Sequence, residues 1–180
     1  MGKRREFACF DAVEAAVECV CRGTVLLQNL AAGEDGADIL RRLQGVSAAA
    51  HRGWRELNGR LGRTFFSAVE REDISTLVRE MAALCHALWR VAVVWHRTLP
   101  RDAAPWAAHL AEGGRLLREL CGELPRLRQE HDLHDRAEAM YDWRREADRL
   151  WAEKQNPAYE AALALARIAD TAEWLALKNT

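Results

Sequence analysis

The sequence predicts an all-α protein: a six-helix antiparallel bundle made of two three-helix halves. Apolar residues recur at three- and four-residue spacing through most of the 180 residues, and no segment alternates with the two-residue period of a strand. Glycines and prolines interrupt this pattern and leave short turns between the helical segments. We therefore expect one domain over residues 1–180, with halves at about 6–99 and 102–178. The periodicity alone would fit any helical bundle.

Two glycines separate the first two predicted helices. An apolar stripe predicts the first helix at about 6–31, and Gly33 and Gly36 end it. Asp38 is the expected N-cap of the second helix, because an aspartate side chain accepts a hydrogen bond from a free backbone N–H in the first turn. The second helix carries its own apolar stripe and ends at Gly62.

The third predicted helix is the most apolar of the chain. Ser67 and Glu70 form an S-x-x-E capping box at its start, and Pro100 marks its limit. The face opposite its core stripe is too apolar for a freely solvated helix. We expect another subunit, the other half of the bundle or a ligand to cover this face. Its residues are Ala82, Ala83, Ala87, Val93 and Val94.

Prolines mark the starts of later helices. Asp102 with Pro105 opens the fourth helix, and Gly113–Gly114 is expected to weaken its middle by about 1 kcal/mol per glycine relative to alanine. The fifth helix carries an apolar stripe and ends before Asn156–Pro157. This dipeptide is an N-cap followed by a first-turn proline, and the sixth helix then runs to about residue 178.

The composition is that of a soluble globular protein. The net charge of −1 gives no electrostatic reason to expect a nucleic acid or an anionic membrane as a partner. The longest apolar run, 82–95, is too short to span a bilayer, so the chain is not expected to be membrane-inserted. An arginine- and alanine-rich chain is typical of a GC-rich bacterial genome, and we expect a cytoplasmic location.

The five cysteines are expected to be reduced thiols. They lie within helical patterns, are odd in number and show no C-x-x-C spacing, so neither a zinc ribbon nor a redox dithiol is favoured. The sequence also lacks a Walker loop, a dinucleotide fingerprint, a nucleophile elbow and an H-E-x-x-H motif. Standard nucleotide and zinc-protease chemistry is therefore not expected, and the sequence leaves open whether the protein is an enzyme.

Three segments resemble the PhoU-like family of phosphate-transport accessory and regulator proteins. Residues 60–74 include L-G-R-T-F-F-S-A-V-E-R-E-D-I, which is similar without a gap to the family pattern L-N-R-T-F-x-T-P-x-D-R-E-D-I. R-E-A-D-R-L-W at 145–151 looks like x-E-A/G-D-R-x-Y, and A-D-T-A-E at 169–173 looks like A/T-D-x-x-E. The resemblance implies a PhoU-like bundle whose partner is a transporter, another helical protein or a second copy of the chain.

The positions that bind metal in the broader family are mostly changed in this chain. Family members carry E-x-x-x-D and D-x-x-D spacings, which place two carboxylates on one helical face and suit iron or manganese. On the second and third helices these positions are Ser47, His51, Ala83 and His86. On the fifth and sixth helices they are Arg144, Asp148, Ala166, Asp170, Glu173 and Trp174. A polynuclear carboxylate site is therefore not expected.

His51 and His86 form the first candidate site. Both replace family carboxylates, so the resemblance places them near one another across the second and third helices. Two imidazoles could hold one transition-metal ion if a further protein ligand or water molecules complete its coordination. Two partly buried histidines that hydrogen-bond to neighbouring groups are the alternative.

The second candidate site lies where the fifth and sixth helices meet. Histidine, tyrosine and carboxylate side chains recur there at helical spacing. They are His134, Glu138, Tyr141, Asp148, Asp170 and Glu173. In a cleft, these groups would give acid–base chemistry or a mononuclear site for Fe, Zn or Mn. Arg144 would instead repel a metal and pair with Asp148, Asp170 or an anion, so a salt-bridged polar seam is the alternative.

Seven tryptophans are the third feature of the chain. Four of them lie at or near predicted inner stripes and are interpreted as core: Trp54, Trp95, Trp143 and Trp151. Trp174 replaces an acidic residue and makes the former metal face more apolar. A metal-free aromatic pocket lined by His51, His86, Trp54 and Trp174 is therefore an alternative to a metal site.

By resemblance, the protein is expected to be an accessory or regulator of phosphate uptake that acts by binding a helical partner. The alternative is a PhoU-like scaffold reused as a small-molecule-binding protein or an enzyme, for example in a biosynthetic pathway. A third class is a purely structural partner protein. We also expect a homo-oligomer, because the apolar face of the third helix needs a cover.

Overall fold

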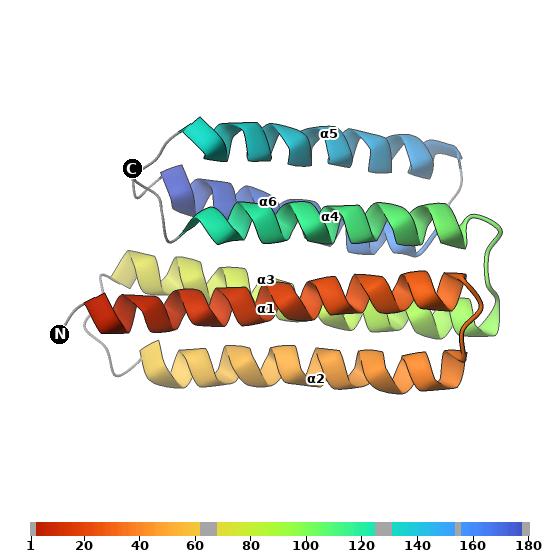
Figure 1. Ribbon diagram of the computed structural model, residues 1–180, viewed down its shortest axis with the longest axis horizontal. Coiled ribbons are helices and arrows are strands. Elements are labelled where there is room, and N and C mark those ends of the chain that lie inside the picture. Colours follow the sequence, from red (N-terminus) through yellow and green to blue (C-terminus); the bar gives the residue numbers. More distant parts are fainter. Residues whose placement is uncertain (1–2, 62–67, 125–130, 154–155, 178–180) are drawn as a thin grey trace.

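The computed structural model describes residues 3–61, 68–124, 131–153 and 156–177. These residues form six helices and no strand, so the all-α prediction is confirmed for them. The helices are α1 (Lys3–Ala31), α2 (Gly36–Leu61), α3 (Ala68–Arg97), α4 (Ala103–Glu123), α5 (His131–Glu153) and α6 (Ala158–Leu177). Successive helices run in opposite directions along one long axis (Figure 1).

The helices α1, α3, α4 and α6 form the centre of the molecule. α2 packs on α1 and α3, and α5 packs on α4 and α6 at the opposite side (Figure 1). Contacts of α1 with α4 and of α3 with α6 join these two groups of helices. The core between them is mostly leucine, alanine and valine with the indoles of Trp95 and Trp106, each 1% exposed. The outer helices α2 and α5 therefore carry much of the surface on which a site can form.

The predicted N-cap of the second helix is wrong by three residues. α2 begins at Gly36, and the side chain that caps it belongs to Asp35. The Asp35 carboxylate accepts the backbone N–H of Ala37 at 3.0 Å. Asp38 lies inside the first turn, where it pairs with Arg41 at 3.1 Å. The end of α1 at Ala31 agrees with the prediction, because the next turn contains a glycine in the left-handed conformation.

The predictions for where the third and fourth helices start have different outcomes. α3 begins at Ala68, but Ser67 and the Glu70 side chain lie outside the described residues, so the capping box stays a prediction. α4 begins directly after Asp102, as the sequence indicates. The Asp102 side chain makes no capping hydrogen bond and contacts Asn156 instead.

Asn156 joins three helices at one end of the bundle. Its Oδ1 accepts the backbone N–H of Ala158 at 2.9 Å, so the predicted N-cap of α6 is confirmed. The same oxygen accepts the indole N–H of Trp95 from α3 at 3.4 Å. The Asn156 amide donates to Asp102 Oδ1, before α4, at 3.2 Å. Asn156 is 3% exposed, and these bonds satisfy polar groups that would be costly to bury alone.

The two adjacent glycines of α4 admit close neighbours and do not interrupt the helix. A Cβ at Gly113 would lie 2.5 Å from the Trp143 ring, and one at Gly114 would lie 3.1 Å from Thr24 Oγ1. The Cys21 thiol donates to the Gly114 carbonyl at 3.2 Å. The expected weak point of the helix is therefore the place where α1 and α5 pack closely on α4.

The apolar outer face predicted for the third helix does not form one surface. Ala82 is fully buried, because α3 packs against α1, α2 and α6. Ala83 is exposed, and Val94 is 48% exposed. Ala87 and Val93 are half-buried. Other helices of the same chain thus cover part of this face, and the rest meets solvent.

Candidate functional site

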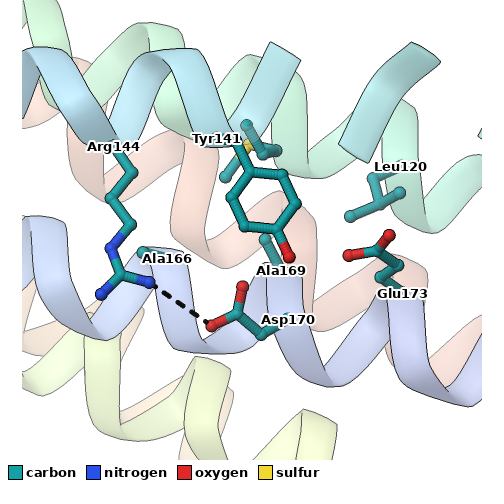
Figure 2. A pocket seen from close by; sticks show the side chains of 8 residues that line it. Leu120, Tyr141, Arg144, Ala166, Ala169, Asp170 and Glu173 are labelled. Carbon is teal, nitrogen blue, oxygen red and sulfur yellow. Dashed lines mark ion pairs between the residues drawn. The ribbon is translucent and has the colours of Figure 1, made fainter. Parts of the chain in front are cut away.

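The cleft between α5 and α6 brings four of the predicted site residues together (Figure 2). Tyr141 and Arg144 come from α5, and Asp170 and Glu173 come from α6. Each pair is three residues apart, so each pair lies on one face of its helix. Leu120 of α4 is among the apolar residues that line the cleft beside them.

Arg144 and Asp170 form an ion pair across the cleft. Arg144 Nη1 lies 3.8 Å from Asp170 Oδ2, and Asp170 is one of the partners expected for this arginine. The two side chains are 44% and 49% exposed, so water screens the attraction and the pair adds little stability. The ion pair matters more for metal binding than for stability, because a guanidinium beside Asp170 opposes the binding of a metal cation there. The cleft residues therefore do not fit the polynuclear metal site of the family.

Tyr141 donates or accepts hydrogen bonds in this cleft as a neutral phenol. The negative charges of Glu173 and Asp170 raise its pKa. A general acid or base works best with a pKa near the operating pH, and this shift moves the phenol further from neutrality. The cleft thus presents charges and hydrogen-bonding groups, with a half-exposed aromatic ring between them.

Asp148 lies away from Asp170 and Glu173, the two acidic residues that line the cleft. Its Oδ1 accepts a hydrogen bond from the Tyr159 hydroxyl at 3.0 Å, and this bond raises the pKa of Tyr159. Tyr159 is near the start of α6, whereas Asp170 lies about 16 Å further along the helix by its rise per residue. Tyr159 was not among the predicted site residues, although its place three residues after the Asn156 cap sets it opposite the last turns of α5.

The tryptophans proposed for an aromatic pocket lie in different parts of the molecule. Trp174 is on α6 and 50% exposed, whereas Trp54 is on α2 and half-buried. α2 packs on α1 and α3, while α6 packs on α3, α4 and α5. The side chain of His134 lies outside the described residues, as does that of Trp151. Trp95 and Trp143 are buried, so their assignment to the core is confirmed.

His51 and His86 lie on the α2–α3 side of the molecule. His51 is half-buried, and the exposed His86 ring lies 5.3 Å from the ring of Trp89. The indole N–H of Trp54 is buried and has no hydrogen-bond partner among the described residues. Within the described ranges, no group of three or more His, Cys, Asp or Glu side chains is arranged to hold a metal ion. The residues predicted to bind metal are thus divided between the α2–α3 and α5–α6 sides.

A half-buried histidine on α4 was not among the predicted site residues. The ring of His109 stacks on that of Trp143, with centroids 4.5 Å apart and planes 5° from parallel. Trp143 Nε1 donates to the His109 carbonyl at 2.8 Å. Burial lowers the pKa of His109 from its usual 6.5 to about 4, against the opposing charges of Glu146 and Glu112. This imidazole is therefore neutral at physiological pH. In the sequence, the position of His109 between Trp106 and Gly113 on one helix face could have indicated that it packs inside the bundle.

Four cysteines are free thiols in the described chain: Cys19, Cys21, Cys85 and Cys121. Burial raises the pKa of each of them, so the thiolate form that reacts or binds metal is disfavoured. The side chain of Cys9 lies outside the described residues. The free thiols at the four described positions agree with the expectation of reduced cysteines.

Comparison with protein-family models gives no match for this chain. Comparison with curated proteins gives none either. The PhoU-like resemblance consequently stays an expectation that rests on the three sequence segments. No helix in the described part of the chain is long and apolar enough to cross a membrane.

Proposed function

We propose that this protein is a PhoU-like accessory or regulatory protein of the bacterial cytoplasm. It would act in phosphate transport by binding a helical partner protein. The three segments that resemble the family support this assignment, and so does the number of helices. The packing of α2 on α1 and α3, and of α5 on α4 and α6, is compatible with two PhoU-like three-helix halves.

The observation that carries the partner-binding function is the composition of the α5–α6 surface. Tyr141 and Trp174 are each 50% exposed, which is unusual for large aromatic side chains. Arg144 and Asp170 lie in the same cleft as Tyr141, and Glu173 precedes Trp174. Tyrosine, tryptophan and arginine supply most of the binding energy in protein interfaces, with polar groups around them. A helix laid along α5 and α6 would bury both rings.

A reused scaffold that binds a small molecule is the second candidate function. It is favoured by the opposite charges of Arg144 and Asp170 beside a phenol, which could orient a zwitterion. The cleft is shallow and both charged side chains are about half exposed, so a small ligand would lose little contact with water there. We therefore rank this function below partner binding.

The test is phosphate uptake in cells of the native host that lack the gene. We expect altered uptake, restored by the wild-type gene and not by the Tyr141→Ala/Trp174→Ala double variant. Removing two interface aromatics should reduce partner affinity by at least about 30-fold, or 2 kcal/mol. Both side chains are exposed, so helical circular dichroism should not change.

Val94→Ala is the matched control for this experiment. Val94 is 48% exposed, and it lies on α3 rather than on the α5–α6 surface. Unchanged uptake in the deletion strain would remove the phosphate role. Full complementation by the double variant would remove the α5–α6 surface as the binding site.

A further inference from the structure

A groove runs along the outer side of the molecule between α1 and α2. It consists of two hollows of about 390 and 330 Å³, both lined by Cys19 and Ala49. On α1 the lining extends from Asp11 to Leu26, which corresponds to about 22 Å of helix. Four turns of another helix would fit along this length.

Both helices contribute small residues to the groove. Those on α1 are Ala12, Ala15, Ala16 and Cys19, and those on α2 are Gly45, Ala49, Ala50 and Gly53. Gly45, Ala49 and Gly53 follow one another at a spacing of four residues, so they lie along one face of α2. Because the distance between packed helices depends on the side chains at the contact, another helix can approach this face closely.

Packing inside the chain does not explain the two glycines of the groove. A Cβ added at Gly45 or Gly53 would meet no atom within 4 Å in the part of the chain that the structure describes. Each glycine nevertheless costs the helix about 1 kcal/mol relative to alanine. At Gly23 of α1, by contrast, a Cβ would lie 2.9 Å from Leu88 Cδ1, so that glycine serves packing within the chain. Contact with another molecule would give Gly45 and Gly53 a comparable role.

The two ends of the groove carry opposite charge. Arg22 and Arg42 line one end, and Asp11 and Glu56 line the other. All four are exposed, and the ion pair that Arg42 makes with Asp38 is a long contact of 3.7 Å. The charges of this groove are complementary to those of a second copy that runs in the opposite direction, because each basic end then faces an acidic end.

The remaining charged residues of the groove leave this asymmetry in place. Glu18 and Arg118 pair with each other at 2.7 Å on the basic side and together add no net charge. Arg60 lies at the acidic end, where Asp11, Glu56 and Arg60 together give −1. Arg22 and Arg42 give +2 at the other end.

We infer that the α1–α2 groove is the contact surface between two copies of this chain. The copies are related by a two-fold axis perpendicular to the groove near Cys19 and Ala49, so that their helices run antiparallel. Such a closed dimer requires one surface that is complementary to itself, and the charge pattern of the groove meets this condition. A parallel arrangement would bring like charges together at both ends. The antiparallel dimer is independent of the proposed role in phosphate transport.

The glycine variants test where the copies meet. In Gly45→Leu/Gly53→Leu, two large side chains fill the groove at positions that are open within the chain, so each monomer should still fold. Sedimentation equilibrium should give twice the chain mass for the wild type and a dissociation constant at least about 30-fold higher for this variant. Gly122→Leu is the matched control, because a Cβ at Gly122 of α4 also meets no described atom and lies outside the groove. A monomeric wild type, or a variant as dimeric as the control, would overturn the inference.

Charge exchange tests the antiparallel direction. The Arg22→Glu/Arg42→Glu variant has two acidic ends, and the Asp11→Arg/Glu56→Arg variant has two basic ends. Each should dimerise poorly alone, whereas a mixture of the two should form a heterodimer at low salt. Failure of the mixture to associate, or retained self-association of either variant, would exclude this arrangement. Binding of a different protein to the groove of a monomeric wild type would assign the groove to another partner.

Discussion

α4 and α2 both contain glycines in mid-helix, but the two helices use them in different ways. Gly113 and Gly114 of α4 lie against Trp143 and Thr24, where a Cβ would be too close. Gly45 and Gly53 of α2 face open space. The same residue type thus supports close packing inside the molecule in one helix and leaves an open groove in the other. This comparison separates the glycines that the fold needs from those that require another explanation.

The largest effect is expected on the packed side, from Gly113→Ala. The added Cβ would lie 2.5 Å from Cζ2 and 2.6 Å from Cε2 of Trp143, which is held by its hydrogen bond to the His109 carbonyl. Overpacking of this kind costs roughly 1–3 kcal/mol, which exceeds the gain of about 1 kcal/mol in helix propensity at the upper part of that range. We expect the free energy of unfolding to fall by about 1–2 kcal/mol in urea denaturation.

Gly122→Ala provides the internal reference for that measurement. It lies in the same helix, and the described residues leave space around it, so the variant should be more stable by up to about 1 kcal/mol. If Gly113→Ala were stabilising to the same extent, the Trp143 ring would have room to move and the close packing of α4 would not be needed.

An effect of similar size is expected from pH at His109. The pKa of the folded imidazole is about 4, below its usual 6.5, so the unfolded chain binds this proton more tightly. The stability contributed by the neutral ring is therefore complete above about pH 6.5 and is lost as pH falls towards 4. After allowance for the partial exposure of His109, we expect a loss of about 1–2 kcal/mol over this range.

His109→Phe separates this titration from that of the carboxylates. Phenylalanine keeps an aromatic ring beside Trp143 but takes up no proton. The difference in unfolding free energy between wild type and variant should grow in favour of the variant as pH falls from 6.5 to 4, because only the wild type loses the histidine contribution. A constant difference would contradict the assigned pKa shift of His109.

The sequence predicted helices well because their signals are local. Periodicity located all six, and the Asn156 cap and the end of α1 were correct. Asp38 was the predicted cap of α2, whereas Asp35 caps it; both are aspartates close to Gly36, and only the backbone decides between them. Local signals are thus sufficient to locate a helix and insufficient to fix the residue at which it begins.

The candidate site was less predictable, because it depends on which helix covers each face. Helical spacing placed Tyr141 with Arg144 and Asp170 with Glu173, and their meeting in one cleft required only that α5 and α6 be neighbours. The stack of His109 on Trp143 depends on the rotation of two helices, which periodicity does not fix. The open space at Gly45 could not be inferred either, since a glycine has the same sequence signal whether it is packed or free.

The smallest effect is expected on the open side, and it has the opposite sign. Gly53→Ala should stabilise the isolated chain by about 0.5–1 kcal/mol, because alanine lowers the entropy of the unfolded chain and its Cβ meets no described atom. Thermal unfolding in dilute solution, where two copies do not associate, would measure this gain. Destabilisation there would show that α2 needs Gly53 for packing within the chain. A gain in dilute solution that diminishes as protein concentration rises would place the requirement for glycine between molecules, since only the associated form would then disfavour the added methyl group.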